Sequence, residues 1–128
     1  MDAKIAVNGE TVTAQVGDAN ITVPAGKAKA LSEGGYDGKT VVLGIRPEDI
    51  HDSQMFIEAS PNSVIEAKIR VYELLGAEVF LYFDYAGTQV TARVDPRTTA
   101  KQGDHIKFAL DMEHAHFFDK ETELVITN

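Results

Sequence analysis

The chain contains no cysteine, and it lacks both a long apolar run and the pattern of a secretory leader. Without cysteine there is no disulfide framework, no thiol nucleophile and no cysteine-bound zinc or iron–sulfur site. No apolar stretch approaches the ~18 residues that indicate a membrane-spanning helix, and no basic segment precedes an apolar one at the start. We therefore expect a cytoplasmic protein. Its 128 residues suffice for one ordinary domain, or for two very small barrels that share an interface.

Positive charge is scarce and dispersed. Twelve Lys and Arg residues face twenty Asp and Glu residues, which gives a formal net charge of -8. Acidic side chains alternate with the basic residues of the second half, which are Lys68, Arg70, Arg93, Arg97 and Lys101. Such a surface repels phosphate backbones, because no face concentrates the cations. Nucleic acids and anionic membranes are therefore disfavoured as partners.

Short alternating runs separated by turn residues predict an all-β protein built from small barrels. Asn8-Gly9 predicts a type I′ hairpin near the start, and residues 65–71 alternate between apolar and charged side chains. Only residues 25–31 suggest a short helical turn. Ser60-Pro61-Asn62 is the best candidate boundary. We expect a single domain, 1–128, with approximate halves 1–62 and 63–128 that exchange strands.

One segment imitates a phosphate-binding loop. Residues 34–40 read Gly-Gly-Tyr-Asp-Gly-Lys-Thr, which is one residue short of the P-loop spacing, and Glu33 occupies the place of the first glycine. A P-loop also opens a helix, whereas this segment opens a β-rich run. A polar turn is the favoured interpretation.

Two groups of polar residues invite a functional interpretation. Asp111, Glu113, His114 and His116 could bind a divalent metal, because the two histidines would share one face of an extended strand. The alternative is a set of partly exposed strand residues that could give pH sensitivity. Arg46 is expected to form an exposed ion pair with Glu48 or Asp49 that fixes a turn.

No residue pattern in the sequence indicates a catalytic site. No Gly-x-Ser-x-Gly elbow occurs, and the adjacent acids Glu48 and Asp49 tend to point apart in a turn. Four aromatic residues stand on or near the strand faces opposite the core: Tyr72, Phe80, Tyr82 and Tyr85. We expect them to pack against a second barrel or an identical subunit rather than to stack nucleic-acid bases.

Three motifs occur in a fixed order: Gly44-Ile45-Arg46-Pro47-Glu48-Asp49, Glu73-Leu74-Leu75-Gly76 and His116-Phe117-Phe118-Asp119. Together they resemble the C-terminal regulatory domain of ATP-binding subunits in sugar ABC importers of the maltose and multiple-sugar class. That family has a Gly-Ile-Arg-Pro-Glu strand end, a Glu-x-x-Gly hairpin opening and a His-Leu-Phe-Asp segment before a Thr-Gly turn. This chain departs from it at Phe117, where leucine is common, and at Glu123, where glycine is typical.

The resemblance implies an OB-like β-barrel regulatory domain, of the transport-associated OB type, with two small packed sub-barrels. The implied role is to hold two ATP-binding subunits together and to receive regulatory signals, without catalysis. The Walker A loop, signature loop and catalytic glutamate of such subunits are absent, so ATP and Mg would bind in a separate ATPase domain and no cofactor is expected here. The implied regulatory or interface residues are Arg46, Pro47, Glu48, Asp49, Glu73, Gly76, His116, Phe118 and Asp119.

The implied partners are a second copy of the subunit, its own ATPase domain, the membrane permease subunits indirectly and a possible regulatory protein. The location would be the cytoplasmic face of the cell membrane. Two other functions stay open. Related domains in molybdate systems bind an oxyanion between barrels, which here would need donors such as Arg46 and Lys39 to converge. An oligonucleotide-binding OB fold is the third possibility.

Overall fold

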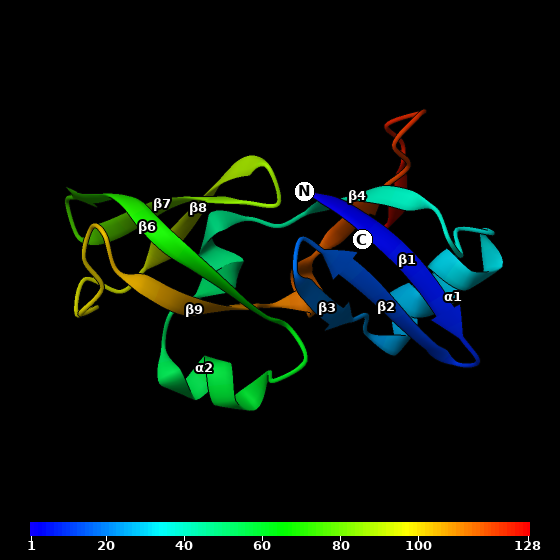
Figure 1. The fold of residues 1–128 in the computed structure, drawn as a ribbon, viewed down its shortest axis with the longest axis horizontal. Coiled ribbons are helices and arrows are strands. Elements are labelled where there is room, and N and C mark those ends of the chain that lie inside the picture. Colours follow the sequence, from blue (N-terminus) through cyan, green and yellow to red (C-terminus); the bar gives the residue numbers. More distant parts are fainter.

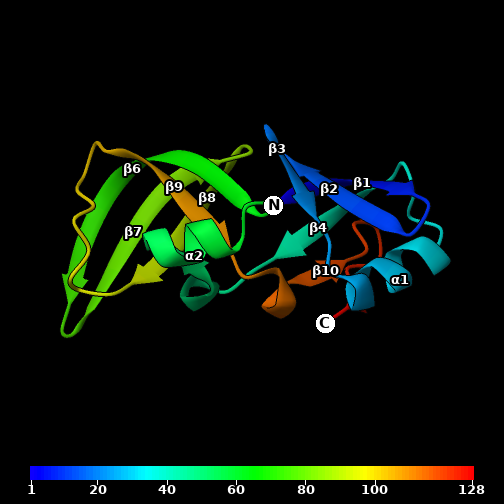
Figure 2. The ribbon, with the colours of Figure 1, turned by 90° about the horizontal axis from the view of Figure 1, so that it is seen from below.

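A computed structural model describes all 128 residues, and it shows two β-sheets in two lobes placed side by side (Figure 1). The first lobe holds a six-stranded sheet in the order β11-β10-β4-β1-β2-β3, and the second holds a five-stranded sheet in the order β5-β9-β6-β7-β8. Strands predominate as expected, so the all-β, OB-like prediction is confirmed. Figure 2 shows that each lobe also carries one short helix.

The first lobe takes its strands from both ends of the chain. They are β1 (Asp2–Asn8), β2 (Thr11–Val16), β3 (Ala19–Thr22), β4 (Thr40–Gly44), β10 (His116–Phe118) and β11 (Val125–Thr127). β1 and β2 form the expected hairpin, but the predicted turn is wrong by one residue. Asn8 pairs with Thr11, so Gly9 and Glu10 make the turn. Only Gly9 has a positive φ, of 68°, which is the type II′ pattern rather than type I′.

The second lobe is one continuous stretch of chain between β4 and β10. Its strands are β5 (Ile50–His51), β6 (Val64–Leu75), β7 (Glu78–Tyr85), β8 (Thr88–Val94) and β9 (His105–Leu110). β6 pairs first with β9 and then with β7, and the register shifts between Ile69 and Val71. The two expected halves therefore share strands: β5, from the first half, pairs with β9, and β10, from the second half, pairs with β4.

The register shift between Ile69 and Val71, a bulge in β6, explains one error of the sequence prediction. Ile65, Ala67 and Ile69 are buried as the alternation predicts, but Val71 is 46% exposed. A one-residue slip sends every following side chain to the other face of a strand. Beyond the shift, Leu74 and Leu75 lie on opposite faces of β6 and both are exposed, so this end of the strand projects past the core. Gly76, with a φ of 63°, makes a tight turn from β6 into β7, as the break in the pattern suggested.

Two helices and two single 3-10 turns complete the fold. α1 (Ala25–Glu33) contains the predicted helical turn, whereas α2 (Gln54–Ala59) is absent from the sequence prediction. Ser53 caps α2 by accepting the backbone N–H of Phe56 at 3.3 Å, which is the ordinary role of serine before a helix. The 3-10 turn η1 (Pro47–Asp49) packs against β8, and η2 (Met112–His114) follows β9 where the chain returns to the first lobe. No helix has the length and apolar character of a membrane span.

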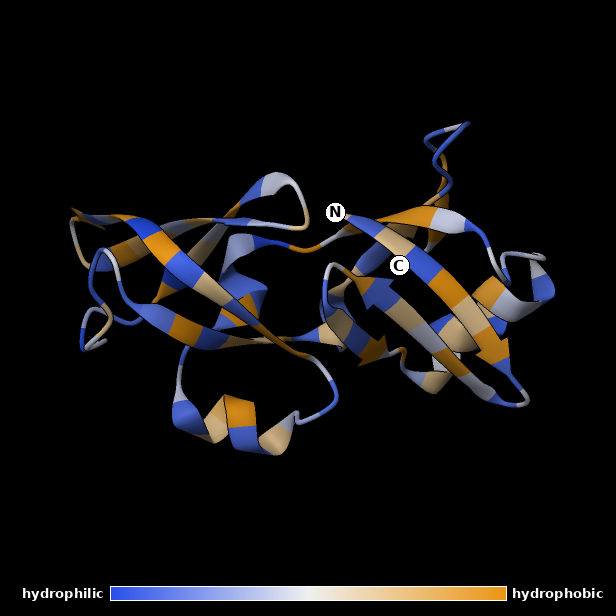
Figure 3. Ribbon diagram, viewed as in Figure 1, coloured by the Kyte–Doolittle hydropathy of each residue, from blue (hydrophilic) through white to orange (hydrophobic).

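Both lobes contribute to one connected apolar core. Figure 3 shows apolar and polar residues alternating along the strands, as half-buried sheets require. The buried residues form a single cluster of 27, which runs from Ile5 and Leu43 in the first lobe to Ile69 and Phe83 in the second. Within the second lobe the rings of Phe83 and Phe108 stack with centroids 4.4 Å apart. The lobes are therefore joined by packing as well as by the chain.

Candidate functional site

The chain crosses between the lobes twice, and both crossings lie together. It leaves the first lobe from β4 through Arg46 into η1, and it returns from β9 through Asp111 into η2. The backbone N–H of Asp111 donates to the carbonyl of Asp49 at 2.9 Å, which ties the two crossings together. We call this region, residues 45–49 and 111–115, the junction. It contains most of the first sequence motif.

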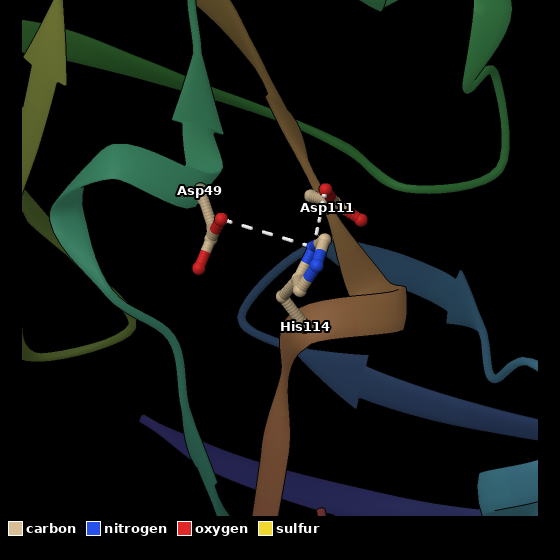
Figure 4. A group of neighbouring side chains, drawn as sticks. All are labelled: Asp49, Asp111 and His114. Atoms are coloured by element: carbon tan, nitrogen blue, oxygen red, sulfur yellow. Dashed lines mark hydrogen bonds and ion pairs between the residues drawn. The ribbon is translucent and has the colours of Figure 1, made fainter.

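Three side chains converge at the junction: Asp49, Asp111 and His114 (Figure 4). His114 Nδ1 lies 2.7 Å from an oxygen of Asp111 and 3.9 Å from one of Asp49. The hydrogen bond to Asp111 raises the pKa of His114, and the charges of Asp111 and Asp49 add to that effect. The imidazole side chain is 67% exposed, while those of Asp49 and Asp111 are 16% and 29% exposed.

This cluster corrects two predictions from the sequence. Asp49 pairs with His114, and Arg46 takes part in none of the ion pairs of the chain, so the expected ion pair of Arg46 is wrong. The predicted pairing of His114 with His116 on one strand face is also wrong, because η2 ends the alternation after β9. His116 lies in β10 with its Nδ1 3.2 Å from the side-chain oxygen of Asn128.

Glu48 points elsewhere than Asp49, in keeping with the expectation that the adjacent acids diverge. Glu48 lines a cleft of about 820 Å³ in the second lobe, which Arg93 and Arg97 line as well. Pro47 is half-buried at the start of η1, where its fixed φ suits the turn. Arg46 and Glu48 are therefore the exposed residues of this part of the motif.

The first and third motifs meet across a pair of strands. His116 pairs with Gly44, and Phe118 pairs with Val42. A Cβ on Gly44 would lie 2.9 Å from Cε2 of Phe118, so the ring occupies the space that any other residue would need at position 44. The glycine of the motif thus has a packing role that the sequence did not reveal.

Asp119 organises the loop that follows β10. Its carboxylate accepts the backbone N–H groups of Glu121 and Thr122 and the hydroxyl of Tyr36 at 2.8 Å. These bonds, that of Thr122 foremost, lower the pKa of Asp119, and the carboxylate raises the pKa of Tyr36. Glu123 has a φ of 63°, a conformation in which glycine is strain-free. The departure from the Thr-Gly pattern therefore falls on a position that requires a positive φ.

The second motif does not join the other two. Glu73 lies on β6 and accepts the hydroxyl of Tyr82 at 3.0 Å, and Gly76 makes the turn at the outer end of the same strand. No hydrogen bond or ion pair links either residue to the junction or to the loop after β10. The structure thus brings together Asp49, Asp111 and His114, and separately Gly44 with His116 and Phe118.

Tyr85 connects the two lobes at a second point. Its hydroxyl donates to the carbonyl of Val16 at 2.8 Å, and its ring lies against Gly17. A third link is the bond from the N–H of Thr22 to the carbonyl of Asn62, at 3.0 Å. For Tyr85, the predicted packing of exposed aromatics against a second barrel is confirmed. The sequence signal was a tyrosine at the end of a strand, on the face opposite the core.

Two family models match the chain. The MalK OB fold domain matches residues 1–50, and the TOBE domain matches residues 43–118, which is more than half of the chain. The chain belongs to the TOBE domain family. The two matches overlap at residues 43–50, which include the first motif, and the TOBE match runs from β4 to β10.

Relatives of this TOBE domain occur in ATP-binding proteins of sugar importers. It is 49% identical over 112 residues to the oligosaccharides import ATP-binding protein MsmX of Bacillus subtilis, covering 88% of this chain and 31% of MsmX. It is 39% identical over 106 residues to the multiple sugar-binding transport ATP-binding protein MsmK of Streptococcus mutans, covering 83% and 28%. The chain thus spans less than a third of the length of these relatives.

A solved structure with the same architecture is that of the cytoplasmic molybdate-binding protein ModG, with molybdate bound. The TM-score is 0.64, over 91% of this chain and 92% of that one, with 11% sequence identity. At that identity the likeness establishes the fold alone.

Proposed function

We propose that this chain is a regulatory and subunit-contact domain of the ATP-binding subunit of a carbohydrate ABC importer. The observation that carries the proposal is the 49% identity to MsmX, an oligosaccharides import ATP-binding protein, over 88% of the chain. The match favours a shared role, because it covers most of the folded unit of two lobes.

In this proposal the domain acts by contact. ATP and Mg bind in a separate ATPase domain of the same subunit, and this domain holds no cofactor needed for hydrolysis. The permease subunits are indirect partners, and the domain works on the cytoplasmic side of the membrane. A regulatory protein that prefers one arrangement of the paired subunits would shift the ATPase cycle by its difference in affinity for the two arrangements.

The surface best suited to contact a second copy is the outer end of β6. Four neighbouring residues there are apolar or aromatic and 38% to 57% exposed: Val71, Tyr72, Leu74 and Leu75. The bulge in β6 turns Val71 outward, so the exposure is built into the strand. Exposed apolar side chains gathered at one end of a strand are typical of a protein contact.

A chimera tests the proposed function. The 112-residue segment of MsmX that matches this chain would be replaced by this chain, and oligosaccharide uptake would be measured in Bacillus subtilis cells whose only MsmX is the chimera. We expect uptake to be restored. A matched chimera carrying ModG, which shares the fold at 11% identity, should fail. Normal protein levels with no uptake from the first chimera would contradict the proposal.

Light scattering tests the contact face in the isolated chain. We expect the average mass to rise with concentration, and Leu74→Asp to abolish the rise. Lys68→Asp, which places the same acidic side chain on the same strand, serves as the control. A strict monomer at every concentration would argue against self-association of the isolated domain through β6.

The alternative function, oxyanion binding, follows from the fold shared with ModG. Lys39 lines a hollow together with Lys120 and the acids Asp119 and Glu121, and Arg46 is not among its residues. The donors considered from the sequence therefore do not converge, and the nearby acids would repel an anion. Calorimetry with molybdate decides the matter: saturable binding at micromolar concentration would favour the alternative.

A further inference from the structure

We propose that Asp49, Asp111 and His114 form a binding site for one divalent transition-metal ion such as Zn²⁺, which would join the two crossings at the junction. One ligand atom from each residue lies within 4.8 Å of the other two. Asp49 comes from η1, Asp111 from the residue between β9 and η2, and His114 from η2, so the site exists only because the two crossings meet (Figure 4).

The spacing suits tetrahedral coordination after a small adjustment. Zinc binds nitrogen and oxygen ligands at about 2.0–2.1 Å, which places neighbouring ligand atoms of a tetrahedron about 3.3 Å apart. His114 Nδ1 lies 2.7 Å from Asp111 and 3.9 Å from Asp49. The first separation must open and the second must close, each by about 0.6 Å, and the two aspartate oxygens, which lie within 4.8 Å of each other, must reach the same spacing. A rotation of the exposed imidazole changes both distances at once.

The charges of the junction also favour a cation. Asp49 and Asp111 are partly buried carboxylates, and neither forms an ion pair with a lysine or arginine. Lysine and arginine pair elsewhere, with acids such as Asp2, Asp84 and Asp95. Glu113, which adjoins His114, adds further negative charge. A divalent ion would neutralise the two aspartates and would replace the proton-mediated contact with His114.

The ligand set selects the kind of ion. An imidazole nitrogen with two carboxylates suits zinc and its neighbours in the transition series, whereas magnesium and calcium prefer oxygen ligands alone. Three protein ligands leave a fourth position, and the exposed side of His114 would place a water molecule there. The bound ion would connect η1 directly to η2 and so restrict movement of one lobe against the other.

Calorimetry on the untagged 128-residue chain, freed of metal by EDTA and dialysis, tests the site with ZnCl₂ and, in parallel, with MgCl₂. We expect one zinc ion per chain and no saturable magnesium binding. His114→Gln and Asp49→Asn should each weaken zinc binding at least about tenfold. His105→Gln is the matched control: His105 is also exposed and lies 3.2 Å from the carboxylate of Glu66, but it has no second acid near its ring nitrogen, so zinc binding should be unchanged.

Thermal unfolding with and without ZnCl₂ gives a second measurement, because a ligand of the folded state raises the melting temperature. The rise should occur in the wild type and in His105→Gln, and it should disappear in Asp49→Asn even if that variant is less stable than the wild type. The proposal is overturned if zinc gives no saturable heat, or if His105→Gln weakens binding as much as His114→Gln. Neither result would bear on the proposed role in sugar import.

Discussion

Replacing Glu123 by glycine should stabilise the domain. Glu123 has a φ of 63° in the loop after β10, and its N–H donates to the carbonyl of Asp119 at 2.8 Å, which fixes that conformation. The left-handed region costs a residue with a Cβ about 1–2 kcal/mol. Glycine avoids this cost but loses roughly 0.5–1 kcal/mol more backbone entropy on folding. The net gain for Glu123→Gly is therefore about 0.5–1 kcal/mol, or about 2–5 °C in melting temperature.

A matched control separates backbone strain from charge. Glu121 lies in the same loop without a positive φ, so Glu121→Gly removes the same negative charge from a chain of net charge -8 but relieves no strain. It should lower the free energy of unfolding, because glycine adds freedom to the unfolded chain. Urea unfolding and thermal scans of the wild type and both variants would measure the difference. A melting temperature of Glu123→Gly at or below that of Glu121→Gly would refute the reasoning.

Three further predictions concern the contacts around the two lobes. Tyr85→Phe should cost about 1 kcal/mol in urea unfolding, because a backbone carbonyl of the first lobe loses its donor. Asp119→Asn should be less stable than the wild type at neutral pH, and the gap should close on acidification. The bond from Thr122 lowers the pKa of Asp119 in the folded protein. The stability that the Asp119 carboxylate contributes is therefore complete above the ordinary carboxyl pKa and is lost as the pH falls through the lowered pKa of the folded state. A difference between Asp119→Asn and the wild type that persists at low pH would contradict this. Gly44→Ala should cost about 1–3 kcal/mol by overpacking, and a second change, Phe118→Leu, should recover part of that loss if the clash with the ring is the cause.

Local patterns in the sequence predicted most of the strands, because alternation reports which face of a strand is buried. The prediction holds for Ile65 through Ile69 and for β7 and β8. It fails at Val71, where a bulge changes the register, and nothing in the sequence marks that shift. α2 was missed although Ser53 provides a helix cap, because the helix is short and none of its residues is buried.

The candidate site was less predictable than the fold, because its residues are brought together by topology. Asp49 and Asp111 are far apart in the sequence, and only the return of the chain through η2 places them side by side. The sequence grouped Asp111 and His114 with His116 from their proximity along the chain. In the structure Asp111 and His114 lie together with Asp49, whereas His116 pairs with Gly44 of β4.

The first motif divides into residues that maintain the fold and residues that a partner could contact. Gly44 accommodates the ring of Phe118, and Asp49 meets the returning chain at the junction. Arg46 and Glu48 are exposed, and neither takes part in an ion pair of the chain. For a regulatory partner that recognises this motif, Arg46 and Glu48 offer the most accessible side chains. Arg46→Ala should consequently leave the free energy of unfolding within about 0.5 kcal/mol of the wild type, whereas Gly44→Ala should lower it. If Arg46→Ala destabilises the fold as much as Gly44→Ala, Arg46 maintains the fold and only Glu48 is left as a docking residue of the motif.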